Sequence, residues 1–262
     1  MKRLRGSDMG KADDKVVVVT GASRGIGRAI AERFALEGAN VVCVARTVNE
    51  GDSRAPGALS TTLESIRSAG GEAQMVVANL GEEEECLRIV EETHASYGKI
   101  DILVNNAVTN FAHPVAEFPT KRWMIGFAVN IHAPFILARE TIPDMREHGG
   151  GAIVNISSGV AIGPGRGPYT DSGWDGMGAL YGSTKAALER FTQGLAAELW
   201  GDNIAVSALS PSQAVFTEGA LLFNKPSPDL PSEPASTMAE ATLLLATEPV
   251  EKVSGRVCYS QQ

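Results

Sequence analysis

Cysteine is scarce in this sequence, which has only Cys43, Cys86 and Cys258 among 262 residues. The three are far apart, odd in number and without the spacing of metal ligands, which argues against a disulfide framework or a cysteine metal site. Isolated thiols of this kind suit a reducing compartment, where they pack as small apolar side chains. The basic start of the chain has no apolar run behind it, so we expect a disordered tail over 1–14 and a cytoplasmic protein.

Positive charge is also in short supply. The 23 Lys and Arg residues are outnumbered by 31 Asp and Glu residues, for a net charge of -8. This balance argues against a nucleic acid or an anionic membrane surface as partner, because both attract basic surfaces. No apolar run is long enough to span a bilayer. We therefore expect a small-molecule partner, and a few well-placed arginines could still bind an anionic cofactor.

Short β-branched runs alternate with longer segments of helical period, the pattern of stacked βαβ units. The alternation predicts an α/β fold, a doubly wound Rossmann-type parallel sheet with helices on both faces, in a single domain over 15–262. The expected strands are Val16–Thr20, Asn40–Ala45, Glu72–Ala78, Ile100–Asn105, Ala152–Ser157 and Asn203–Leu209, with Arg256–Tyr259 at the sheet edge. The expected helices are Arg28–Glu37, Ala58–Ala69, Glu82–Ala95, a region from Glu117 to about Glu147 interrupted near Pro134 and Pro143, and Tyr181–Trp200.

Two irregular segments break this rhythm. Gly163–Gly178 is rich in glycine, proline and aromatic residues, and Pro211–Pro234 holds five of the thirteen prolines. Ligands bind beyond the carboxyl ends of the strands in such sheets, and long loops tend to be functional. We therefore predict substrate loops near 160–178 and 211–235, with tolerated surface insertions as the alternative. The candidate pocket residues are aromatic or apolar and indicate a hydrophobic substrate: Phe111, Trp174, Met177 and Phe216, with His113, Tyr169 and Phe223 as further candidates.

A glycine-rich turn follows the first expected strand and opens the first helix. Gly21 permits a tight turn, Gly25 lets the backbone approach a diphosphate, and Gly27 lets the helix pack against the strand. The diphosphate would lie at a helix N-terminus, where free N–H groups and the helix dipole favour negative charge. The context predicts a dinucleotide site formed by Gly21, Ser23, Arg24, Gly25, Ile26 and Gly27.

The spacing of this turn, Thr-Gly-x3-Gly-x-Gly, resembles the short-chain dehydrogenase/reductase family, in its short single-domain branch. The resemblance continues in the family's order through Asn105-Asn106-Ala107, Asn130, Ser158 and Tyr181-Gly182-Ser183-Thr184-Lys185. Together these matches span about residues 16 to 211. The resemblance implies a nicotinamide cofactor and a homo-oligomer, a tetramer or dimer, formed through the helices within Glu117–Glu147 and Tyr181–Trp200.

The resemblance also implies the catalytic roles. Tyr181 is expected to be the acid/base, Ser158 to donate a hydrogen bond to the reacting oxygen, and Asn130 to orient a water on the path to Lys185. Tyr181 and Lys185 are four residues apart, so they share one helix face, and the ammonium is expected to lower the tyrosine pKa together with the nicotinamide cation. Ser157 is a rival for the role of Ser158. The gap from Ser158 to Tyr181 is longer than the family usually shows, so we expect an unusual pocket roof.

The choice of cofactor depends on the end of the second strand. The residues there are Val44-Ala45-Arg46-Thr47, without the carboxylate that grips a ribose hydroxyl in NAD-specific relatives. Arg24 and Arg46 could flank a 2′-phosphate from two sides, so NADP is favoured over NAD. Two solvated arginines are the alternative. By resemblance the further cofactor contacts are Asn79, Leu80, Asn106, Ala107, Tyr181, Lys185, Pro211 and Thr217. Asn79 replaces the family's usual Asp, and Ser212 follows Pro211 where the family usually has Gly.

These expectations combine into one leading function. We predict an NADP-dependent oxidoreductase that transfers a hydride between the nicotinamide and a hydrophobic ketone or secondary alcohol, without a metal. One alternative is a catalytically silent NADP-binding sensor or scaffold, although a sensor usually loses the tyrosine or lysine that this chain keeps. Another is a sugar-nucleotide epimerase or dehydratase, whose members are typically longer.

Overall fold

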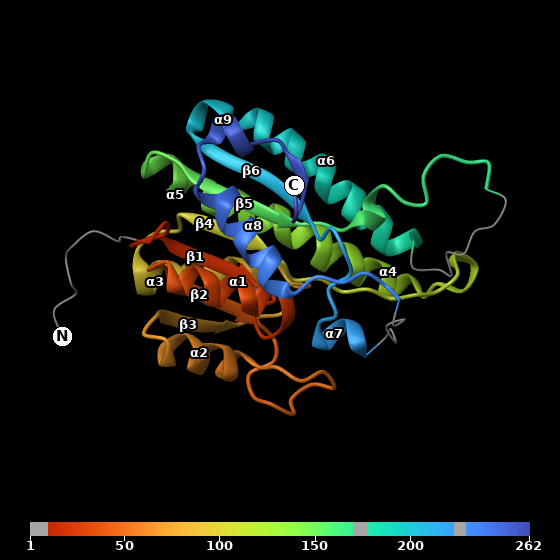
Figure 1. Cartoon of the computed structure of the whole chain (residues 1–262), viewed down its shortest axis with the longest axis horizontal. Coiled ribbons are helices and arrows are strands. Elements are labelled where there is room, and N and C mark those ends of the chain that lie inside the picture. The colour runs from red at the N-terminus through yellow and green to blue at the C-terminus, as the bar shows by residue number, and fades with distance from the viewer. Residues whose placement is uncertain (1–9, 170–177, 223–228) are drawn as a thin grey trace.

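The computed structural model describes residues 10–169, 178–222 and 229–262. Its centre is a seven-stranded parallel sheet with the strand order β3-β2-β1-β4-β5-β6-β7 (Figure 1). The strands are β1 Val16–Thr20, β2 Asn40–Ala45, β3 Glu72–Val77, β4 Ile102–Asn105, β5 Gly151–Ile156, β6 Ile204–Ser210 and β7 Val257–Tyr259. The predicted doubly wound α/β fold is confirmed, and the last strand joins the edge of the sheet beside β6.

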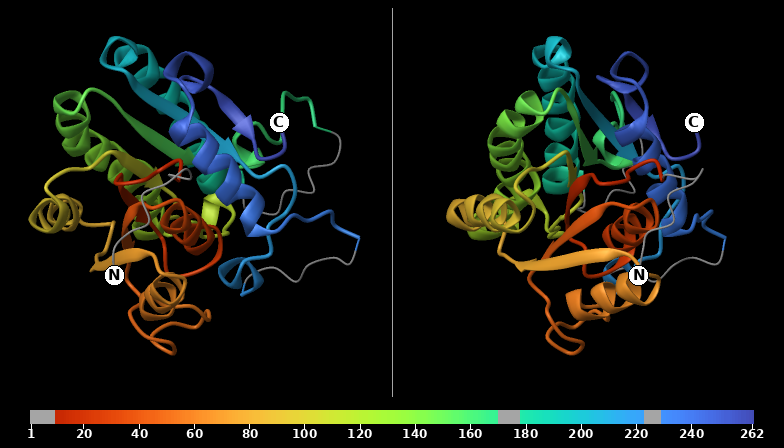
Figure 2. Two further views of the ribbon diagram at one scale, coloured as in Figure 1. Left: turned by 60° about the vertical axis from the view of Figure 1, so that its left-hand side comes forward. Right: turned by 90° about the vertical axis from the view of Figure 1, so that its left-hand side faces the viewer.

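Both faces of the sheet are covered, which explains why most positions of its central strands are apolar. Side chains alternate between the faces of a strand, so Val17 and Val19 enter one core cluster while Val18 enters the other. The first cluster is closed by α1 Gly25–Leu36, α2 Leu59–Ser68 and α8 Ala235–Thr247, and the second by α3 Glu83–Tyr97, α5 Ala133–Glu147 and α6 Ser183–Glu198. Figure 2 shows the sheet between these two layers.

The strand order indicates where a ligand can bind. The chain moves from β1 outward to β3 and then returns to the other side of β1 with β4, so the order reverses between β1 and β4. At such a point the connections leave in opposite directions and open a crevice beyond the carboxyl ends of the strands. Because all strands are parallel, the segments that follow them meet at this one edge.

Helix α8 was not predicted, because the sequence analysis proposed no helix or strand between Pro234 and Ser254. It packs alongside α1, and Met238, Ala239 and Leu243 are buried in the shared core (Figure 1). The short helices α7 Glu218–Leu221 and α9 Val250–Val253 lie on either side of it in the chain. The first of these shows that the predicted loop 211–235 contains a helical turn.

The region 117–147 is divided differently from the prediction. It contains α4 Thr120–Phe127, a π-helical turn Ala128–His132 and then α5. The interruption near Pro134 is therefore real, but the one expected near Pro143 is wrong. Pro143 removes one main-chain hydrogen bond, and α5 nevertheless continues because Ile142 and Met145 beside it are buried.

Residues 10–14 also differ from the expected disordered tail. They form a turn against the end of α1, where the Lys11 N–H donates to the Glu37 carboxylate at 2.6 Å. Ala12 is fully buried in the first core cluster. The order comes from this contact with α1, which no local pattern signals.

In the parts of the chain that the structure describes, no helix is both long enough and apolar enough to cross a membrane.

Candidate active site

The glycine turn between β1 and α1 has the backbone that the sequence predicts. Gly21 and Gly25 have φ values of +71° and +56°, in the left-handed region that favours glycine. A Cβ on Gly27 would lie 2.3 Å from the Gly21 carbonyl oxygen, so any side chain there would collide with the turn. No side chain caps the N-terminus of α1, and no acidic residue lies in its first turn. The turn therefore fits a bound diphosphate, with free N–H donors and no acidic residue in the first turn of the helix.

The residues after β4 are attached to this turn. The Thr20 hydroxyl accepts the main-chain N–H groups of Asn106 at 3.0 Å and Ala107 at 3.1 Å. The Asn106 amide donates in turn to the Thr20 carbonyl at 2.8 Å. Asn106 and Ala107 are thus brought to the glycine turn, as the resemblance implies, and the bonds explain why threonine and asparagine occur at these positions.

Arg24 lies where the 2′-phosphate was expected, but its guanidinium is already engaged. Its Nη2 donates to the Thr47 hydroxyl at 3.2 Å, the Ser53 hydroxyl at 2.9 Å and the Gly57 carbonyl at 2.8 Å. Its Nε is buried without a hydrogen-bond partner. Arg24 therefore organises the loop after β2, which the sequence did not indicate, while Arg46 on the same edge is exposed.

The Glu50 and Asp52 carboxylates of this loop are engaged in hydrogen bonds. Glu50 accepts the Thr61 hydroxyl at 2.7 Å and the Gly57 N–H at 2.8 Å, and these bonds hold the pKa of its carboxyl below the usual value. Asp52 accepts the Asn49 N–H at 2.8 Å. Both acids thus serve the loop itself, and neither takes the place of the missing carboxylate at the end of β2.

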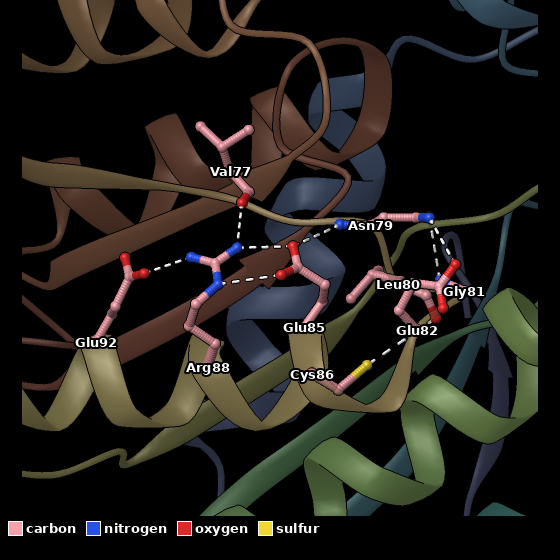
Figure 3. A network of polar contacts seen from close by, with 9 residues as sticks. All are labelled: Val77, Asn79, Leu80, Gly81, Glu82, Glu85, Cys86, Arg88 and Glu92. Carbon is pink, nitrogen blue, oxygen red and sulfur yellow. Dashed lines mark hydrogen bonds and ion pairs between the residues drawn. The ribbon is translucent and has the colours of Figure 1, made fainter.

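At the end of β3, Asn79 is exposed and its side-chain oxygen accepts the Gly81 N–H at 3.2 Å (Figure 3). Leu80 beside it is buried in the second core cluster. Arg88 fastens β3 to α3, because its Nη2 donates to the Val77 carbonyl at 2.6 Å and pairs with Glu85 at 2.7 Å. The adenine contact expected of Asn79 and Leu80 would therefore be made from a rigid turn.

Three of the four predicted catalytic side chains, those of Ser158, Tyr181 and Lys185, lie where β5 ends and α6 begins. The Ser158 hydroxyl lies near enough to the Tyr181 hydroxyl to lower the pKa of the phenol. The Lys185 ammonium lies 5.7 Å from the centroid of the Tyr181 ring and donates to the Ile156 carbonyl at 2.6 Å. Tyr181 belongs to a π-helical turn, Gly178–Gly182, and not to the first turn of α6 as predicted.

Burial controls the charges at this cluster. It lowers the pKa of the Lys185 ammonium to about 8, although Glu189 opposes the shift. It also raises the pKa of Tyr181, and the Ser158 hydrogen bond offsets only part of that rise. The protein groups alone therefore do not lower the pKa of Tyr181 as expected, because burial of the phenol raises this pKa by more than Ser158 lowers it.

Asn130 is buried in the other π-helical turn, and its side chain is tightly held. Its oxygen accepts the Thr109 N–H at 2.9 Å, while its two amide hydrogens go to the Thr109 carbonyl at 2.9 Å and the Thr184 hydroxyl at 3.1 Å. Thr184 donates onward to the Tyr181 carbonyl at 2.9 Å. Asn130 is thus linked to Tyr181 through Thr184, a residue that the sequence analysis quoted only as part of a motif.

The structure gives the two adjacent serines, Ser157 and Ser158, different neighbours. The Ser158 hydroxyl is at the Tyr181 side chain and also accepts the Val160 N–H at 3.4 Å, so it caps a short 3-10 turn as well. The Ser157 hydroxyl donates to the Glu189 carboxylate at 2.6 Å. Ser158 is therefore the serine beside the tyrosine, and Glu189 is a site residue that the sequence analysis missed.

The segment after β6 reaches the glycine turn. Thr217 packs so closely that a Cβ on Gly25 would lie 2.8 Å from its methyl carbon. Pro211 directly follows β6. Phe216 lines a cleft of about 500 Å³ against α1, with Gly25 and Arg28 among its other walls. Thr217 is thus brought to the expected cofactor site, while Phe216 faces a cleft that Tyr181 does not line.

A second cleft of about 800 Å³ lies between the segment after β4, the residues after Ser158 and the start of α6. It is lined by His113, Pro114, Val115, Ala161, Gly163, Pro164, Gly178, Ala179, Gly182, Ser183 and Ala186. Phe111 is not in this lining; its ring lies under the Arg122 guanidinium, 5.5 Å away. Trp174, Met177 and Phe223 lie outside the described residues.

The sequence matches known proteins over most of its length. Residues 15–220 match the family described as short chain dehydrogenase. A short chain dehydrogenase of Pseudocercospora fijiensis is 35% identical over 213 residues, 80% of this chain and 63% of the fungal protein. Hydroxysteroid dehydrogenase-like protein 2 of Bos taurus is 31% identical over 240 residues, 92% of this chain and 55% of the bovine protein. The chain therefore spans less than two thirds of the length of either relative.

Solved structures share the fold. L-sorbose reductase from Gluconobacter frateurii, complexed with NADPH and L-sorbose, has a TM-score of 0.78 and 30% identity, covering 97% of both chains. A 7α-hydroxysteroid dehydrogenase complexed with NADH and 7-oxo glycochenodeoxycholic acid has a TM-score of 0.78 and 27% identity, covering 95% of this chain and 93% of the other. These two proteins hold different nicotinamide cofactors and different classes of substrate, so both choices depend on this chain's own residues.

Proposed function

Because this chain belongs to the short-chain dehydrogenase/reductase family of nicotinamide-dependent oxidoreductases, we propose that it transfers a hydride between NADP and a hydrophobic ketone or secondary alcohol. The observation that carries the proposal is that the Ser158 and Tyr181 hydroxyls lie close together beside the buried Lys185 ammonium. Two hydroxyl donors and a cation are what a carbonyl oxygen needs as negative charge develops on it.

In the reduction, Tyr181 donates its proton to the carbonyl oxygen and Ser158 donates a hydrogen bond to the same atom. Lys185 stabilises the phenolate that remains, and Asn130 keeps the start of α6 in position through Thr184. The glycine turn, Asn106 and Thr217 would hold the cofactor, whose nicotinamide supplies the hydride when it is bound. In the oxidation, the Tyr181 phenolate takes the hydroxyl proton.

Three features support NADP as the cofactor. The exposed Arg46 guanidinium lies at the end of β2, and Arg24 reaches the same edge through Thr47. Glu50 and Asp52 are hydrogen-bonded within the loop after β2, and neither stands at the end of β2, where NAD-specific relatives carry a carboxylate. Guanidinium groups bind phosphate oxygens in a bidentate geometry.

We predict that NADPH binds more tightly than NADH, and that Arg46→Ala removes most of the difference. A hydrogen bond to a charged group contributes about 1.5–3 kcal/mol, so NADPH affinity should fall about 10- to 100-fold while NADH affinity stays the same. Nicotinamide fluorescence measures both dissociation constants. Arg139→Ala, on the exposed surface of α5, is the matched control. Equal affinity of the wild type for NADH and NADPH would remove the proposed 2′-phosphate site.

A second prediction concerns the link through Thr184, which is fully buried. Thr184→Val keeps the shape but removes the hydroxyl that joins Asn130 to the Tyr181 carbonyl. We expect kcat to fall about 10-fold, the equivalent of one lost hydrogen bond near 1.4 kcal/mol, with little change in KM for NADPH. Thr184→Ser restores the hydroxyl and should restore kcat. If serine and valine reduce kcat equally, the hydroxyl has no such role.

The proposal also covers the class of substrate, the oligomeric state and the cellular location. The cleft between the segment after β4 and α6 is largely apolar, which suits a hydrophobic ketone or alcohol; Tyr181 does not line it, but its neighbour Gly182 does. Met124 of α4 and Phe135 of α5 are exposed, and these two helices together with α6 are the ones through which we propose a homo-oligomer, a tetramer or dimer. All three cysteines are free, in keeping with the cytoplasmic location that we propose.

A further inference from the structure

Lys185 presents an electrostatic problem that its place in the proposed reaction does not explain. Its side chain is 3% exposed, and its one described hydrogen bond goes to the Ile156 carbonyl at 2.6 Å. A buried ammonium is costly unless another group compensates its charge, and without compensation it loses its proton. A neutral lysine could not stabilise a phenolate on Tyr181.

Glu189 is the acidic residue whose charge acts on this ammonium, although the two groups form no direct ion pair. It follows Lys185 by four residues on α6, so the two side chains share one face of the helix. The Ser157 hydroxyl donates to its carboxylate at 2.6 Å, which holds the carboxylate against the end of β5. Its negative charge raises the pKa of Lys185 against the effect of burial.

No second charge takes this role in the part of the chain that the structure describes. The strands β5 and β6 that pack against α6 contain no charged residue. His132 on the adjacent π-helical turn is exposed, and Asp202 at the far end of α6 pairs with Arg146 at 2.7 Å. On the π-helical turn that precedes α6, the other titratable neighbour of the ammonium is Tyr181, the group that it is proposed to serve.

We propose that Glu189, held by Ser157, is the positioning residue that keeps the Lys185 ammonium charged at the active site. The proposal rests on the proposed function of Lys185 and adds two residues, Ser157 and Glu189, to the machinery. It also explains the two adjacent serines: Ser158 faces the reacting oxygen, and Ser157 orients the counter-charge of the lysine.

The direct test is the titration of Lys185 in protein labelled with 13C at the lysine ε-carbons, with Lys185→Arg used to assign its NMR signal. Glu189→Gln keeps an oxygen that can accept the Ser157 hydrogen bond but removes the charge. We expect Lys185 to titrate about 1 pH unit lower in this variant, because the ammonium loses its compensating charge. Glu198→Gln, on the exposed surface of the same helix, is the control and should leave the titration unchanged.

The same shift should appear in the reaction. In Glu189→Gln, the limb of the pH–kcat profile in which activity falls with rising pH should move to lower pH by the same amount. Ser157→Ala should move it in the same direction by less, because the charge remains but is no longer held. Coincident wild-type and Glu189→Gln titrations, or an equal shift in Glu198→Gln, would overturn the inference. A wild type that reduces no ketone would instead contradict the proposed function, since the titration needs no substrate.

Discussion

Replacing Tyr181 by phenylalanine should lower kcat by about 10²- to 10⁴-fold, the usual contribution of a positioned general acid. Phenylalanine keeps the ring that lies 5.7 Å from the Lys185 ammonium but removes the proton that the carbonyl oxygen must receive. Binding of NADPH should stay within about 2-fold of the wild type, because the glycine turn that would hold the diphosphate is untouched. The measurement is steady-state reduction of a hydrophobic ketone, with cofactor binding followed by fluorescence.

Tyr97→Phe is the matched control for this variant. It removes a hydroxyl of the same kind from the last residue of α3, on a helix that carries none of the proposed catalytic residues. It should leave kcat unchanged. A Tyr181→Phe enzyme that retained activity near the wild-type level would take the proton transfer away from this residue. Turnover that is absent even in the wild type, with NADPH still bound, would favour the silent cofactor-binding protein instead.

The second large effect is expected from Gly27→Ala, in the turn that opens α1. The new Cβ would lie 2.3 Å from the Gly21 carbonyl oxygen and 2.4 Å from the Asn106 amide nitrogen. Because the first of these is backbone, it cannot move aside without opening the turn. Overpacking of this kind costs about 1–3 kcal/mol of stability, and we expect NADPH affinity to fall by at least about 10-fold. Thermal unfolding and nicotinamide fluorescence measure the two effects.

Gly201→Ala is the control that shows whether the effect of Gly27→Ala comes from the collision with the turn or from replacing any glycine. Nothing lies within 4 Å of a Cβ at Gly201, which also has no positive φ. This variant should unfold like the wild type and bind NADPH normally. If Gly27→Ala did the same, the turn would have room for a side chain, and the close approach of the diphosphate to the backbone would lose its basis.

The elements that the sequence predicted best are those with a purely local signal. The strand Val16–Thr20 is apolar at its first four positions and buried at all five because both of its faces are covered, and a run of β-branched residues shows this without knowledge of its neighbours. The glycine turn is similar, since positive φ values and a missing Cβ leave glycine as the residue of choice. The spacing of Tyr181 and Lys185 is also local, because one turn of helix places the two side chains on the same face.

Helix α8 shows where local signals fail. Its sequence follows a proline-rich loop and is apolar around much of its circumference, so no clear helical face distinguishes it. What makes it a helix in this place is the surface of α1 and the sheet, on which Met238 and Leu243 are buried. The ordered turn at residues 10–14 likewise depends on Glu37 at the end of α1, which is distant in sequence.

By itself, then, the sequence determined the class of fold, the positions of most strands, the glycine turn and the Tyr181–Lys185 pair, because each depends on residues close together in the chain. Only the tertiary structure decided which serine meets Tyr181, that Arg24 organises the loop after β2, and that Glu189 stands beside Lys185. It also decided the direction of the Tyr181 pKa, which burial raises. These properties depend on atoms from segments that are far apart in sequence, and the charge and hydrogen-bonding state of a side chain is set by what those segments place around it.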